Sequence, residues 1–273
     1  MPKILDGTEL VGYIKERQAK QVRALRQASK VFPRLVVIKS TSATAVIDTY
    51  VRMKQRYAED ILIETVVETI DESEMISALQ RLNADPMVHG IIVQLPLKDI
   101  SKTDEIVDQI APEKDVDGLG KNAGFESATA GAVSWLLAGY AVELTGKKIA
   151  IVGNGRLVGA PLAKMWRDSG HDVTVLDSTH ADIPGVLRQS DVIVSATGVP
   201  NLIKSDMVAI GATVVDAGTA SENGVIVGDV DPSLRDRDDL KITPEKGGVG
   251  PLTIAALFDH VIQAAQTVAS TKN

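Results

Sequence analysis

The sequence predicts an α/β fold of two domains flanking a cleft. First, the chain has 273 residues, which is long for one compact domain and comfortable for two. Second, strand and helix patterns alternate along it, which is typical of βαβ units and mainly parallel sheets. Third, aromatic residues make up only 3%, so the cores must consist of Val, Ile, Leu and Ala, a mix that suits sheets buried on both faces.

The first block of elements occupies the N-terminal part of the chain. Apolar positions at helical spacing predict its helices, and short aliphatic runs predict its strands. Asp71 stands directly before one helix, where its side chain can cap the N-terminus. The predicted helices are 8–28, 46–59 and 72–83, and the predicted strands are 34–39, 61–67 and 90–95.

A second block begins near residue 120. Four strands with a helix after the first fit a Rossmann-like dinucleotide-binding domain. We therefore divide the chain into 1–122 with 249–273, and 123–248, and expect the last helix (253–270) to pack back onto the first domain. The four predicted strands are 147–153, 172–177, 191–196 and 212–218, and the helix is 158–169.

Composition excludes several classes of protein. The net charge of −7 argues against a dedicated nucleic-acid binder. The absence of cysteine excludes disulfides and thiolate metal sites, and the four histidines lack metal-ligand spacing, so no metal is expected. We find no run that approaches the roughly 20 apolar residues of a membrane span and no signal-peptide pattern at the start. We expect a soluble, cytoplasmic protein without nucleic-acid or membrane partners.

A glycine-rich turn follows the first strand of the second block. Gly153, Asn154, Gly155 and Gly159 span the connection from the end of that strand to the start of the next helix. Glycines let the backbone approach a pyrophosphate, and the helix N-terminus offers unpaired N–H groups. A tight strand–helix connection would show the same glycines, but the strand before and the helix after favour dinucleotide binding.

Asp177 and Ser178 end the next strand, where an acidic side chain accepts hydrogen bonds from the adenosine ribose. The Asp177 carboxylate would repel the 2′-phosphate of NADP, so it favours NAD over NADP. The competing interpretation is that Asp177 only caps the turn that follows.

Candidate substrate residues come from four other segments. Tyr50 and Lys54 are four residues apart on a predicted helix and share one face, although a lone helical lysine is usually a solvated charge. Gln94 ends a buried strand, where ligands gather in open α/β sheets. Asp117 lies on a turn at the domain border. The run GGVGP at 247–251, which contains Gly248 and Pro251, offers another loop of backbone N–H groups.

In this order, these segments resemble the methylenetetrahydrofolate dehydrogenase/cyclohydrolase family. The resemblance spans nearly the whole chain, and VQLPL, KDVDG and GGVGPLT are its most specific segments. It implies two α/β domains flanking a cleft, usually in a homodimer. It also implies oxidation of 5,10-methylenetetrahydrofolate to the methenyl compound with NAD(P), followed by hydrolysis to 10-formyltetrahydrofolate. The matching segments also include ILDGTEL, TYVRMK, GIIVQLPL, VGNGRLVGAP, SATGVPNLI and GDVD.

The resemblance implies a role for each matching residue. Lys54 corresponds to the central acid/base group of the hydrolysis, and Gln94 to the residue that orients it. Tyr50 corresponds to a tyrosine lying along the folate, and Asp117 to the aspartate that holds the polar edge of the pterin. The run containing Gly248 and Pro251 would lie beside the folate site, and the glycines at 153, 155 and 159 in the cofactor loop.

Several family positions are changed. Asn154 stands where an arginine commonly meets the 2′-phosphate of NADP, and Gly155 replaces the serine after it, which strengthens the preference for NAD. Ile47 replaces a serine and Lys246 a proline near the folate site, so hydrolysis is the more open of the two activities. The alternatives are a monofunctional NAD-dependent dehydrogenase and a catalytically silent binding protein. A shikimate-dehydrogenase-like enzyme shares the architecture, but the specific segments favour folate.

Overall fold

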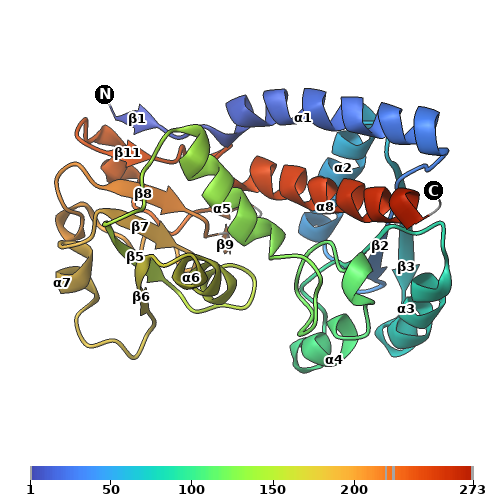
Figure 1. Cartoon of the computed structure of the whole chain (residues 1–273). Helices are drawn as coiled ribbons and strands as arrows, with labels where there is room; N and C mark the ends of the chain where they lie inside the picture. Colours follow the sequence, from blue (N-terminus) through green and yellow to red (C-terminus); the bar gives the residue numbers. More distant parts are fainter. Residues whose placement is uncertain (1, 219, 223–224, 272–273) are drawn as a thin grey trace. The chain divides into compact units, whose positions relative to one another are not determined.

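The computed structural model describes residues 2–218, 220–222 and 225–271 (Figure 1). The chain divides into two compact units. The first, called here the six-stranded unit, comprises Met1–Val11 and Thr129–Thr253, and the second, the three-stranded unit, comprises Gly12–Ala128 and Ile254–Asn273. Both contain parallel sheets with helical connections, so the α/β fold in two parts is confirmed.

The three-stranded unit has a parallel sheet in the order β3-β2-β4. Helix α2 connects β2 to β3, and α3 connects β3 to β4, as predicted. Thr44 caps α2 by accepting a hydrogen bond from the Ile47 N–H (3.5 Å), and Asp71 accepts the N–H of Ser73 just before α3. The elements are β2 Arg34–Ser40, α2 Ala45–Asp60, β3 Glu64–Ile70, α3 Met75–Ala84, β4 Gly90–Val93 and α4 Thr103–Val107.

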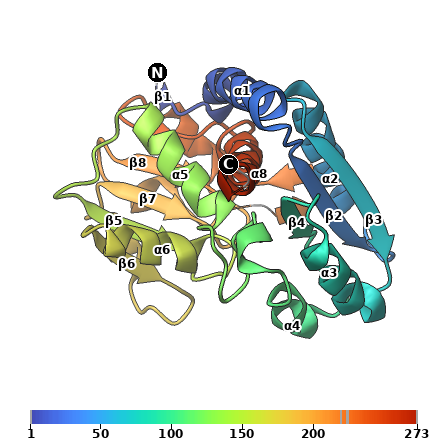
Figure 2. The same cartoon turned by 45° about the vertical axis from the view of Figure 1, so that its right-hand side comes forward.

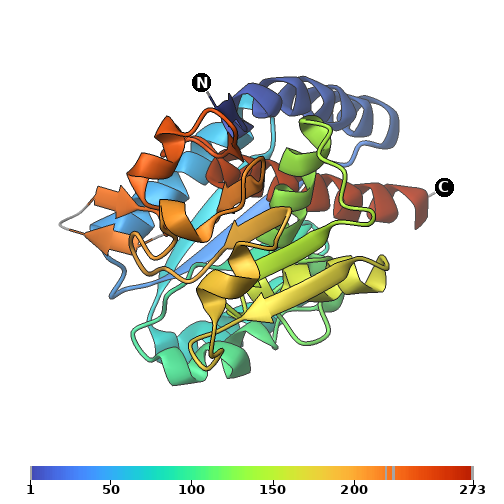
Figure 3. The same ribbon diagram turned by 90° about the vertical axis from the view of Figure 1, so that its left-hand side faces the viewer.

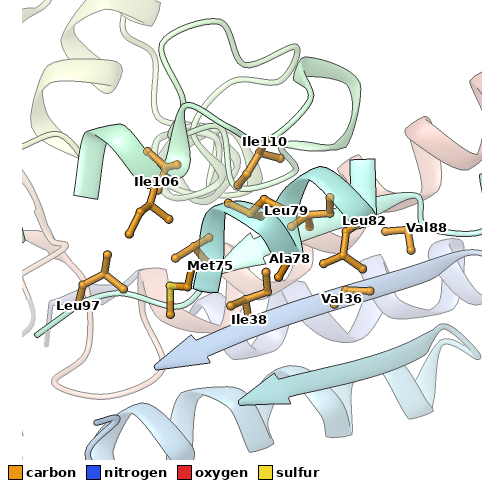
Figure 4. Close-up of a cluster of buried hydrophobic side chains, with 13 residues drawn as sticks. Val36, Ile38, Met75, Ala78, Leu79, Leu82, Val88, Leu97, Ile106 and Ile110 are labelled. Carbon is orange, nitrogen blue, oxygen red and sulfur yellow. The ribbon is translucent and has the colours of Figure 1, made fainter. Parts of the chain in front are cut away.

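One core of this unit lies between α3 and the sheet (Figure 4). Met75, Leu79 and Leu82 recur at helical spacing on α3 and are at most 2% exposed. They meet Val36 and Ile38 of β2. Figure 4 also shows Ile106 and Ile110 contributing from the segment after the sheet.

Most of two long helices belongs to the three-stranded unit: α1 (Gly7–Ala24) from Gly12 onward and α8 (Val249–Thr271) from Ile254 onward. The buried Gln18 of α1 donates to the Ala255 carbonyl of α8 (2.8 Å) and accepts from the Tyr57 hydroxyl (2.8 Å). Tyr57 also stacks on Phe258 of α8, with ring centroids 5.4 Å apart. The last helix therefore packs on α1 and α2 within this unit (Figure 1).

By length and composition α8 is the one described helix apolar enough to cross a membrane, which the sequence reading missed. Of its most apolar window, 61% is buried inside the protein. That burial is typical of a core helix of a soluble protein, so α8 is weak evidence for a membrane span.

The six-stranded unit has an all-parallel sheet in the order β1-β11-β8-β7-β5-β6. From β5 the chain passes to β6 on one side and returns to β7 on the other side of β5. Helix α6 packs on β5 and β6 (Figure 2), and β9 and β10 form a separate hairpin, orange in Figure 3. The elements are β1 Lys3–Ile4, α5 Ala128–Gly139, β5 Lys148–Val152, α6 Gly159–Asp168, β6 Asp172–Leu176, α7 Ile183–Leu187, β7 Val192–Ser195, β8 Thr213–Asp216, β9 Ala220–Glu222, β10 Val225–Val227 and β11 Lys241–Ile242.

The remaining helical segments are single turns. A π-helical turn, Leu25–Ser29, extends α1. The 3₁₀ turns are Glu72–Glu74, Ile100–Lys102, Pro112–Lys114, Ser205–Met207 and Pro232–Asp236.

Several boundaries differ from the sequence-based predictions, and three of the differences have a clear structural cause. Strand β3 begins at Glu64 instead of 61, because Leu62 adopts a left-handed turn (φ 64°) after α2 while Ile61 and Ile63 are buried in the connection. Helix α8 begins at Val249, so the run 247–251 is only partly a loop. Residues 1–11 group with the six-stranded unit because β1 pairs with β11, and two-residue strands leave no periodic signal in the sequence.

Candidate active site

Lys54 and Gln94 form a buried hydrogen-bonded pair in the three-stranded unit. Lys54 projects from α2 and is only 9% exposed, and its Nζ donates to Gln94 Oε1 at 2.6 Å. Gln94 directly follows β4, where its N–H donates to the Ile38 carbonyl (2.8 Å) and its Nε2 to the Leu95 carbonyl (3.1 Å). Because the amide nitrogen is committed to Leu95, the amide oxygen faces the lysine.

Asp117 supplies the third member of this group. Burial lowers the pKa of the Lys54 ammonium, and the Asp117 carboxylate offsets part of that effect. Burial raises the pKa of Asp117, while Lys54 and, more weakly, His260 lower it. Each charge is therefore stabilised chiefly by the other, and the lysine is a group that can exchange a proton more readily than a solvated lysine.

The loop that carries Asp117 is fixed on both sides. Lys114 Nζ donates to three backbone carbonyls at the end of α3, at 2.7–3.1 Å. The buried Asp115 carboxylate accepts the N–H groups of Gly118 (3.0 Å) and Gly120 (2.7 Å). These contacts preorganise the turn, and the sequence reading assigned no role to Lys114 or Asp115.

His260 of α8 holds the same turn from another element. Its Nδ1 lies 2.9 Å from the carbonyl oxygen of Val116, and its ring stacks on Phe125 with centroids 4.8 Å apart. The sequence analysis gave His260 no role beyond the absence of metal-ligand spacing. Nothing in the local sequence indicates this contact, because it joins residues 144 positions apart.

Tyr50 lies one helical turn before Lys54 on α2 and is partly buried. Burial raises the pKa of its phenol, which therefore stays protonated at neutral pH. Helical spacing gives it the same face as Lys54. Ile47, one turn earlier, is 5% exposed and packs as a core residue.

Gly248 and Pro251 belong to the six-stranded unit, at the start of α8. The backbone there meets the N-terminal segment ILDGTEL: the Thr8 N–H donates to the Gly247 carbonyl (3.1 Å). A side chain at position 7 would overlap the Gly248 carbonyl. Two segments that the family resemblance singles out separately are thus neighbours, whereas the exposed Lys246 precedes them.

The glycine-rich turn has the geometry that close backbone approach requires. Gly153 has φ +102°, and its N–H donates to the Leu176 carbonyl at 2.7 Å. A side chain at Gly153 would lie 2.5 Å from the Ala196 carbonyl oxygen, and one at Gly159 would overlap the Gly153 carbonyl. Asn154 and Gly155 are exposed between them, and a Cβ at Gly155 would meet no other atom. The close backbone packing of this turn therefore depends on Gly153 and Gly159.

Asp177 and Ser178 are exposed directly after β6. Asp177 Oδ1 accepts from the N–H (2.9 Å) and the hydroxyl (2.6 Å) of Thr179, so the turn-capping interpretation is correct. The same hydrogen bonds lower the pKa of Asp177, which is therefore a carboxylate at neutral pH. Capping the turn and presenting a negative charge beside the glycine loop are compatible.

Comparisons with known proteins match both units. The description "Tetrahydrofolate dehydrogenase/cyclohydrolase, catalytic domain" covers residues 5–117, and the NAD(P)-binding domain of the same family covers 127–269. Bifunctional protein FolD of Lactobacillus delbrueckii subsp. bulgaricus is 38% identical over 277 residues, 96% of this chain and 97% of the relative.

Solved structures agree with this assignment. The bifunctional FolD enzyme of Campylobacter jejuni superposes with a TM-score of 0.91 at 35% identity, covering 98% of this chain and 99% of the other. A 5,10-methylenetetrahydrofolate dehydrogenase from the silkworm Bombyx mori gives 0.90 at 34%, covering 99% and 100%. A shikimate dehydrogenase from Thermus thermophilus gives only 0.50 at 15% identity, covering 87% of this chain and 99% of the other, which is a likeness of fold alone. The chain therefore belongs to the tetrahydrofolate dehydrogenase/cyclohydrolase family.

Proposed function

We propose that this protein oxidises 5,10-methylenetetrahydrofolate to 5,10-methenyltetrahydrofolate with NAD(P) and hydrolyses the product to 10-formyltetrahydrofolate. The buried pair of Lys54 and Gln94, with the Asp117 carboxylate beside it, is the observation that carries the proposal. A silent binding protein has no need of a buried lysine whose pKa is lowered and whose amine is aimed by an amide oxygen.

The oxidation needs little direct chemistry from the side chains. The hydride leaves a methylene carbon between two nitrogens, whose lone pairs stabilise the resulting cation. The nicotinamide supplies the hydride acceptor, and positioning it is the main requirement. The glycine-rich turn fits such a cofactor. Its backbone leaves no room for side chains at Gly153 and Gly159, and it leads into the N-terminus of α6, where unpaired N–H groups can meet a pyrophosphate.

Hydrolysis needs proton transfers as water adds to the methenyl carbon and the ring opens. Lys54 is the group proposed to move these protons, since its pKa is lowered by burial. Gln94 would keep the amine in place, Asp117 would bind the polar edge of the pterin, and Tyr50 would lie along the folate.

We propose NAD as the preferred cofactor. Asn154 carries no charge to meet a 2′-phosphate, and the Asp177 carboxylate would repel one. Gly155 and Ser178 complete the exposed surface at these two turns.

One assay tests the reaction and the cofactor together. Methylenetetrahydrofolate is supplied with NAD or NADP, and the reduced cofactor and the methenyl product are followed by absorbance. We expect a higher kcat/KM with NAD and a methenyl compound that decays by enzyme-catalysed hydrolysis. Equal or better efficiency with NADP would refute the cofactor proposal. If neither cofactor were reduced, the proposed dehydrogenase activity would be refuted.

The second candidate is a monofunctional NAD-dependent dehydrogenase. The buried Ile47 on α2 and the exposed Lys246 favour it, because the resemblance places a serine and a proline there. Reduced NAD formation with a methenyl product that decays only at the uncatalysed rate would select this alternative.

We also propose a cytoplasmic homodimer, on the strength of the family resemblance. Sedimentation equilibrium of the purified chain tests the assembly, with twice the chain mass as the expected result. Fractionation of the source cells tests the location.

A further inference from the structure

A buried carboxylate, Asp229, organises the turn that follows β7 in the six-stranded unit. Its side chain is fully buried, and its Oδ2 accepts from Ser195 Oγ (2.8 Å) and from the N–H (2.6 Å) and hydroxyl (2.9 Å) of Thr197. Thr197 Oγ1 also accepts from the Val199 N–H at 3.0 Å. Because this hydroxyl donates to Asp229 and accepts from Val199, it fixes the backbone path of the turn at residues 197–199.

Asp229 is in turn held by the neighbouring strand. Asp216, the last residue of β8, accepts the N–H of Asp229 at Oδ1 (3.0 Å) and the N–H of Val230 at Oδ2 (3.1 Å). Arg235 Nη2 lies 3.6 Å from Asp216 Oδ2, and the Asp216 N–H donates to Thr243 Oγ1 (2.9 Å). A continuous set of hydrogen bonds therefore joins the end of β8 to the turn after β7.

This turn lies where the strand order reverses. Strands β5 and β7 are neighbours, but the chain visits β6 on the other side of β5 between them. In open α/β sheets ligands bind at such a point, outside the carboxyl ends of the strands. A Cβ at Gly153 would lie 2.5 Å from the Ala196 carbonyl oxygen and 3.2 Å from Thr197 Cγ2. Ala196 and Thr197 thus lie directly beside the glycine loop.

The two halves of a dinucleotide would occupy opposite sides of this point. Asp177, at the end of β6, marks the side of the adenosine ribose. The pyrophosphate belongs at the glycine loop and the N-terminus of α6. The turn after β7 lies on the other side of β5, toward which the nicotinamide half must extend.

We propose that Asp229 is a positioning residue for the nicotinamide half of the cofactor, acting through the Thr197 turn. The proposal rests on the dinucleotide site proposed above. The proposal gives Asp229 and Asp177 different roles. Loss of Asp229 loosens the nicotinamide end of the cofactor and leaves the adenosine end, beside Asp177, in place.

Two substitutions perturb the same contact from opposite sides. Asp229→Asn keeps the size of the side chain and replaces a charged acceptor by a neutral amide. Thr197→Val removes the hydroxyl that meets Asp229, while Thr197→Ser retains it. Asp231→Asn is the matched control, because that partly exposed carboxylate caps a neighbouring turn through Ser233 and pairs with Lys204.

Calorimetric titration with NAD and with ADP-ribose, which lacks the nicotinamide, is combined with KM values for NAD and methylenetetrahydrofolate. We expect Asp229→Asn and Thr197→Val to weaken NAD binding and raise its KM by about tenfold, the size of one charge-assisted hydrogen bond. ADP-ribose affinity and the folate KM should stay at the parent values. Thr197→Ser and Asp231→Asn should behave as the parent does.

Unchanged NAD affinity in Asp229→Asn and Thr197→Val would overturn the proposal. An equal loss of NAD and ADP-ribose affinity would also overturn it, because a purely structural carboxylate would disturb both halves. A parent protein that bound neither ligand would instead refute the dinucleotide site itself, so the two failures are distinguishable.

Discussion

At the scale of single residues, the lysine on α2 shows how burial changes the protonation of a side chain that is commonly found on the surface. Desolvation disfavours the ammonium, so the pKa of Lys54 falls, and the Asp117 carboxylate limits that fall. The hydrogen bond to Gln94 Oε1 fixes the direction of the amine without supplying a charge. The surroundings of Lys54 therefore set both the pKa of its amine and the direction in which the amine points.

Lys54→Met should abolish hydrolysis of methenyltetrahydrofolate while the protein stays folded. Methionine keeps the apolar stem and removes the amine, and a general acid/base group contributes about 10²- to 10⁴-fold. Hydride transfer needs no proton transfer and should suffer less. Lys20→Met, at an exposed lysine of α1, is the control and should hydrolyse at the parent rate. Parent-rate hydrolysis by the Lys54 variant would remove the lysine from the mechanism.

Asp117→Asn should move the pH dependence of hydrolysis and weaken folate binding. The carboxylate raises the pKa of Lys54, so its removal lowers that pKa further, and the limb that reports Lys54 shifts to lower pH. Loss of a charged hydrogen-bonding partner typically weakens binding by about 1.5–3 kcal/mol. The measurement is kcat against pH at saturating substrate, with Asp60→Asn as a surface control. A profile unmoved in the Asp117 variant would contradict the coupling.

At the scale of elements, the strand–turn–helix connection after β5 has two kinds of residue: those that fix its backbone path and those proposed to set the preference for NAD or NADP. Gly153 and Gly159 are fixed by close backbone approach. Asn154 and Asp177 are exposed and are not confined by close backbone approach, so under the proposed function they would set the charge that the cofactor meets. Substitution at these two positions should therefore change cofactor preference without changing the fold.

The double variant Asn154→Arg with Asp177→Ser should shift preference from NAD toward NADP. It adds a cation for the 2′-phosphate and removes the carboxylate that repels it. The ratio of kcat/KM values for the two cofactors measures the effect, and thermal midpoints check the fold. A ratio equal to the parent's would show that neither residue faces the ribose.

Phe258 is the largest fully buried side chain that helix α8 contributes. This side chain is fully buried and stacks on Tyr57. Phe258→Ala should destabilise the three-stranded unit by about 3–5 kcal/mol, as large-to-small core substitutions of phenylalanine do. Urea unfolding measures the change, with Tyr13→Ala on α1 as control, since Tyr13 is 72% exposed. A loss no larger than the control's would mean that α8 is not a core helix.

Short aliphatic runs predicted strands such as β2 and β5, which are buried along most of their length, and helical spacing predicted α3, which buries one apolar face. These patterns did not find every element. They missed β1 and β11, since two paired residues carry no period. The Lys54–Gln94 contact agrees with what the family resemblance implied. The hydrogen bonds of Asp229 and His260 join residues 32 and 144 positions apart, so only the folded chain brings them together.

At the scale of the whole molecule, each unit has its own sheet, its own core and its own candidate ligand residues. Lys54, Gln94 and Asp117 lie in the three-stranded unit, and the glycine loop with Asp177 and Asp229 lies in the six-stranded unit. Under the proposed function this division would separate carbon-unit chemistry from cofactor selection, so the binding of the two ligands should be measurable independently.

Hydrogen exchange with each ligand should therefore protect different segments. A ligand at one hundred times its Kd stabilises the bound form by about 2.7 kcal/mol, which slows local exchange by about a hundredfold. With NAD we expect the strongest slowing at Gly153 and Thr197, whose N–H groups donate to Leu176 and Asp229. With a non-reactive folate analogue we expect it at Gln94 and Gly118, whose N–H groups donate to Ile38 and Asp115. Slowing by NAD at residues 114–118 with none at 153–159 would contradict the assignment of the two ligands to the two units.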